Sequence, residues 1–163
     1  MNTNIDKKPG FKIAGLAYTL NDRNESKAIR DKFLNEYKNK GIEDFGSFYG
    51  LMEFNALEQN YNYFLGFELA DKEVIDDLDF NLREIPESYY LELDIEDENL
   101  GEAYDYTYQK FFPNKKYFHG LGPDVEFYQY DQKDEKIGNV CLYICLKLNP
   151  HIEGEDMIWK RKS

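Results

Sequence analysis

The sequence predicts an α+β domain made of two similar halves, each with a strand, a helix and two further strands in that order. Apolar residues recur at helical spacing in two segments and alternate at strand spacing in the segments between them. Equivalent strands recur at an offset of about 75 residues, by pattern and not by residue identity. Neither unit can bury both of its faces alone, so we expect the two to pack as a pseudo-twofold pair.

The first half is expected over residues 11–78, after an N-terminal tail of residues 1–10. An apolar segment with somewhat mixed faces predicts the first strand at 11–20. The first helix is predicted from Ser26 to Asn39, because its apolar residues form one stripe: Ile29, Phe33, Leu34 and Tyr37. Two strands follow, around 48–52 and over 61–69.

The second half is expected over residues 79–150, before a C-terminal tail of residues 151–163. Strict alternation predicts a strand over 89–95, with Tyr90 on the face opposite Leu91. A helix is predicted from Leu100 to Phe112. Its first turn is expected to be capped by Asn99, with Glu102 completing a capping box. The last two strands are expected near 125–130 and over 139–148.

The chain of 163 residues carries 32 acidic and 20 basic side chains, a formal net charge of −12. This balance opposes direct contact with nucleic-acid phosphates or anionic lipid, and favours cationic ligands or basic protein surfaces. Neither an apolar run of membrane-spanning length nor a signal-peptide pattern is present, so we expect a cytoplasmic protein.

The residues that most often carry catalysis or bind metals are sparse. Cys141 and Cys145 lie four apart in a predicted strand, roughly 13 Å apart, which is too far for a disulfide. His119 and His151 are isolated in sequence, so we expect no metal and no cofactor. No Ser-His-Asp or Cys-His arrangement and no glycine-rich phosphate loop is found, and we assign no catalytic residue.

One carboxylate stands out. Gly122, Pro123 and Asp124 predict a turn, and the aromatic run behind them predicts a strand that contains Glu126. Alternation places Glu126 and Tyr128 on the same face of this strand. A carboxylate among aromatic rings is costly to ionise unless a cation or hydrogen-bond donors meet it. Glu126 is therefore a candidate binding residue; the alternative is an exposed strand glutamate paired with a lysine.

Four segments resemble the GyrI-like small-molecule-binding domains. Residues 61–69 are similar to their Tyr-x-Tyr-x-x-Gly-x-Glu-Val strand, and residues 85–90 to their Ile-Pro-x-Gly-x-Tyr step, with Ser88 in place of Gly. Residues 102–113 resemble their second helix, and residues 122–128 their Gly-Pro-x-Phe-Glu-x-Tyr segment. The sequence departs from the family where Phe33 replaces a common Trp and Val125 an aromatic residue.

The resemblance implies an SH2-like pair of strand-helix-strand-strand units with antiparallel sheets and a ligand cleft between the halves. In multidrug-binding members of this family a buried glutamate at the position of Glu126 meets cationic aromatic ligands, while aromatic side chains stack on them. The candidate ligand-binding residues are therefore Glu126, Tyr90, Tyr63, Tyr104, Phe33 and Tyr128. For the tyrosines other than Tyr128, an ordinary place in the core or at the cleft rim is the alternative.

Three functions are compatible with this resemblance. The first is a stand-alone module that binds hydrophobic, cationic small molecules and acts as a sensor, a sequestering protein or a transcription-effector module. The second is a hydrolase of strained electrophilic natural products that uses Glu126 and a tyrosine. The third is an acidic protein that binds a basic protein partner, as DNA gyrase inhibitors in this family do.

Overall fold

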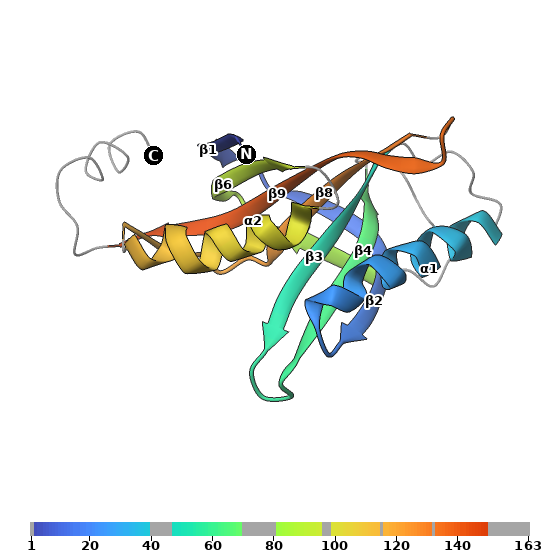
Figure 1. Ribbon diagram of the computed structural model, residues 1–163, viewed down its shortest axis with the longest axis horizontal. Helices are drawn as coiled ribbons and strands as arrows, with labels where there is room; N and C mark the ends of the chain where they lie inside the picture. Colours follow the sequence, from blue (N-terminus) through green and yellow to red (C-terminus); the bar gives the residue numbers. More distant parts are fainter. Residues whose placement is uncertain are drawn as a thin grey trace.

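A computed structural model describes residues 2–39, 47–69, 81–95, 99–114, 116–131 and 133–149. These residues form an α+β fold, a nine-stranded antiparallel sheet that carries two helices (Figure 1). The strands are β1 (Asn2–Lys8), β2 (Phe11–Leu20), β3 (Ser47–Asn55), β4 (Asn60–Glu68), β5 (Asn81–Ile85), β6 (Ser88–Ile95), β7 (Tyr117–His119), β8 (Asp124–Asp131) and β9 (Lys136–Leu148). The helices are α1 (Ser26–Asn39), preceded by the 3-10 turn η1 (Arg23–Glu25), and α2 (Leu100–Tyr106).

The strands run in the order β1-β6-β9-β8-β3-β4-β2-β5, and β7 pairs with β9 outside this path. The middle of the sheet is the pairing of β3 with β8, which sets Gly50 opposite Glu126. Glu126 therefore lies at the centre of the sheet, where strands from the two halves of the chain meet.

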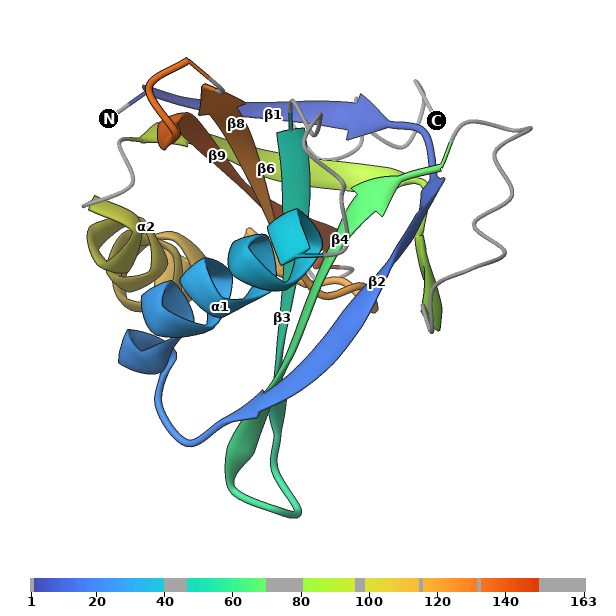
Figure 2. The ribbon, with the colours of Figure 1, turned by 90° about the vertical axis from the view of Figure 1, so that its right-hand side faces the viewer.

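Both helices cover the same face of the sheet (Figure 2). The main core lies beneath them and joins Phe33 and Tyr37 of α1, Ala103 and Tyr104 of α2, and Leu142 of β9. A second, smaller core lies elsewhere in the sheet and includes Ile13, Leu51, Phe64, Ile85, Tyr90, Val125 and Cys145. The apolar stripe predicted for the first helix thus faces the sheet, as amphipathic helices do.

The second helix differs from its prediction in two respects. The α-helix ends at Tyr106 and continues as a π-helical turn, η3 (Thr107–Phe111), and a 3-10 turn, η4 (Phe112–Asn114). Asn99 makes no side-chain capping hydrogen bond, so the capping box predicted with Glu102 is wrong. Its backbone, with φ −101° and ψ 11°, lacks the extended conformation that an N-cap residue usually adopts.

The N-terminal residues, expected to be a tail, form strand β1 and pair with β6 from Asn2 opposite Asp94 to Lys8 opposite Ser88. The same register continues where β2 pairs with β5, from Phe11 opposite Ile85 to Gly15 opposite Asn81. Residues 2–15 and 81–94 therefore form one long ladder, interrupted only by a corner at Pro9-Gly10 and Pro86-Glu87. Gly10 suits this corner, because a Cβ there would lie 2.8 Å from the Ile85 carbonyl oxygen.

None of the helices within the described ranges is long and apolar enough to cross a membrane.

Deleting residues 2–8 should destabilise the fold, although their side chains are almost all exposed. The deletion removes several ladder hydrogen bonds, each contributing about 0.5–1.5 kcal/mol, and we expect a loss of about 2–4 kcal/mol in the free energy of unfolding. Urea unfolding followed by circular dichroism measures this loss. A control in which Thr3 and Asn4 become Ser keeps the backbone ladder and should change stability by less than about 0.5 kcal/mol. An unchanged midpoint for the deletion would contradict the importance of β1.

Candidate functional site

The side chain of Glu126 is completely buried on strand β8, with a relative exposure of 0%. Space for the carboxylate comes from Gly50 on the neighbouring strand, because a Cβ at that position would lie 2.9 Å from both Glu126 Oε1 and the Tyr63 hydroxyl. A glycine within a strand often marks such a close approach. The exposed glutamate that was the alternative interpretation is therefore excluded.

Three tyrosine hydroxyls donate hydrogen bonds to this carboxylate. Tyr63 (2.5 Å) and Tyr128 (2.6 Å) donate to Oε1, and Tyr104 (2.5 Å) donates to Oε2. They come from β4, β8 and α2, so the carboxylate joins both halves of the sheet to the second helix. Hydrogen bonds to a charged acceptor are short and strong, and they satisfy a group that would otherwise be costly to bury.

Burial, reinforced by the charge of Glu126, raises the pKa of Tyr63, Tyr104 and Tyr128 well above the usual value for tyrosine. All three phenols therefore stay protonated at neutral pH and act as donors. None of them is a base under those conditions.

A buried arginine lies on the other side of this group. Arg30, on α1, donates from Nη1 to the Tyr63 hydroxyl (3.3 Å) and to Ser26 Oγ (3.0 Å). Its guanidinium also lies over the Tyr128 ring, 4.8 Å from the centroid. Arg30 thus donates to Tyr63, which in turn donates to Glu126. This chain of hydrogen bonds places the positive charge of Arg30 near the negative charge of Glu126 and offsets part of the free-energy cost of burying that carboxylate.

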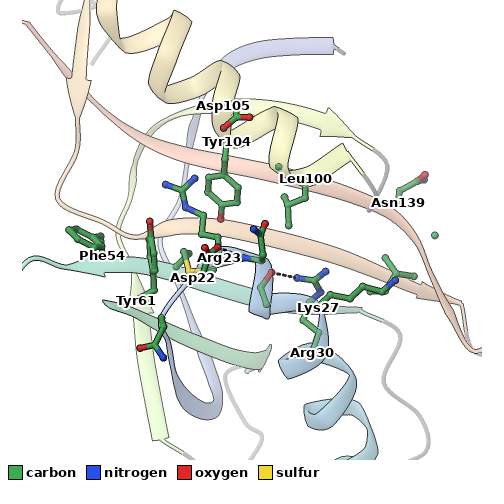
Figure 3. A pocket seen from close by; sticks show the side chains of 17 residues that line it. Asp22, Arg23, Lys27, Arg30, Phe54, Tyr61, Leu100, Tyr104, Asp105 and Asn139 are labelled. Atoms are coloured by element: carbon green, nitrogen blue, oxygen red, sulfur yellow. Dashed lines mark hydrogen bonds between the residues drawn. The ribbon is translucent and has the colours of Figure 1, made fainter. Parts of the chain in front are cut away.

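A cleft of about 940 Å³ opens beside this group, between the starts of the two helices and the strands below them (Figure 3). Tyr104 and Arg30 line the cleft, whereas Glu126 lies behind them and does not reach its surface. Charged groups of both signs surround the opening, including Asp22, Lys27 and Asp105. The cleft volume is within the roughly 300–1,000 Å³ typical of small-molecule sites.

Arg23 of η1 extends into this cleft (Figure 3). Its guanidinium lies over three tyrosine rings, 4.5 Å from the centroid of Tyr104 and 5.4 Å from those of Tyr61 and Tyr108. We refer to Tyr61, Tyr104 and Tyr108 as the aromatic cage. Tyr104 belongs both to the aromatic cage and to the group around Glu126, because its ring face contacts Arg23 while its hydroxyl donates a hydrogen bond to Glu126.

Two of the predicted site residues lie away from Glu126. Tyr90 faces the smaller core, donates to the Pro86 carbonyl oxygen (2.6 Å) and lines a separate pocket of about 190 Å³. Phe33, on α1, is fully buried in the main core and packs on Tyr37, Phe48 and Phe67. The structure therefore brings together Glu126, Tyr63, Tyr104 and Tyr128, and leaves Tyr90 and Phe33 elsewhere.

Sequence reasoning missed Arg30, Gly50 and Arg23. Arg30 is three, four and seven residues before Phe33, Leu34 and Tyr37, so helical spacing places it beside the apolar stripe. A charged residue at such a position indicates a buried charge that needs a partner. Gly50 interrupts a predicted strand, which is also a usable signal. Arg23 lies in a polar turn, and no pattern in the sequence distinguishes it from an exposed arginine.

A further polar cluster fixes the outer wall of the cage. The carboxylate of Asp124, which is buried, accepts hydrogen bonds from the Tyr108 hydroxyl and from His119 Nε2, the latter at 2.7 Å. Burial alone would lower the pKa of His119, but the hydrogen bond and charge of Asp124 outweigh this effect and raise it. We assign the donor role at Nε2 on that basis.

No group of three or more His, Cys, Asp or Glu side chains among the described residues could hold a metal ion. Cys141 and Cys145 are both free thiols.

The family model described as Cass2, integron-associated effector binding protein, matches residues 4–146. The chain belongs to this family. The match covers most of the chain, and it confirms the GyrI-like resemblance of the sequence. It also begins inside β1, in keeping with the place of that strand in the sheet. No curated protein is similar enough in sequence to give a significant match.

Solved structures share the fold of this Cass2 family member at low sequence identity. An integron cassette protein from Vibrio cholerae is 12% identical, with a TM-score of 0.60 over 89% of this chain and 95% of that one. SAV2435, solved with bound tetraphenylphosphonium, is 13% identical, with a TM-score of 0.67 over 90% and 94%. EcmrR, solved in a complex with DNA, is 11% identical, with a TM-score of 0.62 over 90% of this chain and 57% of that one.

Replacing Gly50 by Ala should destabilise the protein, because the new methyl group would crowd the Glu126 carboxylate and the Tyr63 hydroxyl. Overpacking of this kind costs about 1–3 kcal/mol. The matched control is Gly101→Ala, at a position of α2 where a Cβ would meet nothing within 4 Å. That change should be neutral or stabilising, by up to about 1 kcal/mol. Urea unfolding of both variants checks the pair, and equal effects would contradict the close approach at Gly50.

The pair of His119 and Asp124 should stabilise the fold fully below about pH 6.5, which is the usual pKa of histidine. Since the folded pKa of His119 is raised, this contribution is lost as the pH rises through that folded value. The difference in unfolding free energy between the parent protein and His119→Gln should therefore shrink at alkaline pH.

Removing the second histidine, by His151→Asn, makes the titration unambiguous, because the chain has two histidines. An NMR titration of the remaining His119 should give a pKa above that of free histidine. A value at or below it would refute the assigned partnership with Asp124.

Proposed function

We propose that this protein binds hydrophobic, cationic small molecules in the cleft beside Tyr104, with Glu126 as the buried counter-charge. The observation that carries the proposal is the position of a fully buried carboxylate directly behind an aromatic wall of the cleft. Membership of an effector-binding family supports a small-molecule ligand. The lipophilic cation bound to SAV2435, which shares the fold, supports the ligand class.

The physical basis is the coupling of the carboxylate to the ring. A phenol that donates to an anion carries more electron density on its ring, so Tyr104 presents a more negative face to the cleft. A cation over such a face gains about 0.5–2 kcal/mol, depending on its desolvation. A flat apolar ligand adds about 25 cal/mol for each Å² of apolar surface that it buries. No rigid hydrogen-bond pattern is required, which suits a pocket that accepts several ligands.

The same geometry favours binding over hydrolysis. A hydrolase would need Glu126 to activate water or to donate a proton to substrate. Instead its two oxygens accept from three hydroxyls, and the side chain has no exposed surface.

In the cell, such a module would serve as a sensor or as a sequestering protein for toxic cations, and we propose that it acts in the cytoplasm. The formal charge of −12 argues against direct contact with nucleic acid. If the protein also controls transcription, we expect it to do so through a protein partner.

We further infer that the domain is a pseudo-twofold pair of units, residues 11–78 and 79–150. The strand order supports this inference: β6-β9-β8 on one side of the centre corresponds to β2-β4-β3 on the other. The unit boundary lies outside the described residues.

Replacing Glu126 by Gln should weaken binding of tetraphenylphosphonium by about tenfold or more, because it removes the buried charge while retaining an acceptor of similar shape. Isothermal titration calorimetry measures the affinity, and urea unfolding shows whether the fold is kept. Asp105→Asn is the matched control, since it removes one negative charge from the exposed cleft rim. We expect a change of less than about threefold there, because exposed charges are screened.

Unchanged affinity in a folded Glu126→Gln protein would refute the role of this carboxylate. Absence of binding by the parent protein to any lipophilic cation would refute the proposed ligand class.

A further inference from the structure

Arg23 occupies a place where three tyrosine rings would be available to a ligand cation. Resting on the proposed function, we propose that Arg23 is an internal competitor: a cationic ligand must displace its guanidinium from the aromatic cage before it can bind. The protein would thus bind only those cations whose contacts with the cage and its surroundings are worth more free energy than the contacts of Arg23.

The first support is the way in which Arg23 is held. Its guanidinium has three ring faces within 5.4 Å. Its Nε is buried and finds no hydrogen-bond partner among the described residues, and no carboxylate in that part of the chain lies within salt-bridge distance. Cation–π contact is therefore its main attachment.

The second support is that each ring of the cage has a contact other than Arg23. Tyr104 is fixed by its hydrogen bond to Glu126, and Tyr108 by its hydrogen bond to Asp124. Tyr61 packs against Phe54, with ring centroids 5.2 Å apart. Each ring has its own anchor on the protein, so the cage should persist when the guanidinium leaves, and such preorganisation favours a replacement ligand.

The third support is the position of Arg23 in the chain. It lies in η1, a single 3-10 turn whose residues are not buried, and its backbone leads directly into α1. Its long side chain can leave the cage by rotation of its own torsions, without movement of a helix. Arg30, in contrast, is held deep in the structure by Ser26 and Tyr63 and cannot leave so easily.

This arrangement predicts selectivity by size. A large lipophilic cation covers the cage and adjacent apolar surface, so it gains enough binding free energy to displace the guanidinium. A small quaternary ammonium ion gains only the ring contacts that Arg23 already makes and buries little further apolar surface. Tetraphenylphosphonium should therefore bind the parent protein, whereas tetramethylammonium should not.

The test compares Arg23→Ala with Lys27→Ala. Both residues line the cleft and both changes remove one positive charge, but only the first empties the cage. We expect Arg23→Ala to bind tetraphenylphosphonium about tenfold more tightly, and to gain measurable affinity for tetramethylammonium. Lys27→Ala should tighten binding by less than about threefold, the effect of a screened like charge. Calorimetry gives the affinities, and urea unfolding confirms that both variants are folded.

A second measurement follows Arg23 itself in the parent protein. The side-chain NMR signals of Arg23 should be shifted by the ring currents of the cage, and should move to ordinary positions when tetraphenylphosphonium binds. Ligand binding without this change, or equal affinities in the two alanine variants, would overturn the displacement proposal and leave the proposed function standing. Weaker binding by Arg23→Ala would also overturn it, by making Arg23 a ligand contact. Failure of every variant to bind either cation would overturn both proposals.

Discussion

The structure depends on the burial of one carboxylate. Glu126 lies at the meeting point of the two central strands, and its charge must be compensated where water cannot reach it. Three hydroxyls and a nearby guanidinium supply that compensation. Because these groups belong to α1, α2, β4 and β8, the requirement fixes how both helices lie against the sheet. Gly50 belongs to the same constraint, since any larger side chain would occupy the space of the carboxylate.

Much of this could be predicted from the sequence. The apolar stripe of the first helix and the alternation around Glu126 identified the correct elements and faces, because both depend on local periodicity. Strand β1 could not be predicted in this way, since its residues are polar and exposed and its stability comes from backbone pairing with a distant segment. The structure places Tyr90 away from Glu126, and alternation could not show this: Tyr90 and Leu91 are both buried, so the pattern does not say which face of β6 adjoins the cleft.

The charges of the cleft differ between its opening and its depth. Side chains of both signs surround the opening, among them Asp22, Lys27 and Asp105, so no single sign dominates there. In the depth, the Glu126 carboxylate lies behind the Tyr104 ring, and buried Arg30 lies beside it. Under the proposed function, preference for a cation would therefore come from the aromatic surface and the carboxylate behind it, and not from the rim.

The long ladder that joins residues 2–15 to residues 81–94 affects how the chain acquires its structure. During synthesis, part of strand β2 has no partner until β5 has emerged, and β6 in turn needs β1 from the beginning of the chain. Each half therefore has strands whose partners belong to the other half. Until the other half is present, the backbone hydrogen-bonding groups along these strands remain unpaired. Pairings so distant in sequence make folding slow. A nascent chain of this architecture consequently has an interval in which its unpaired strand edges are open to pairing with another copy.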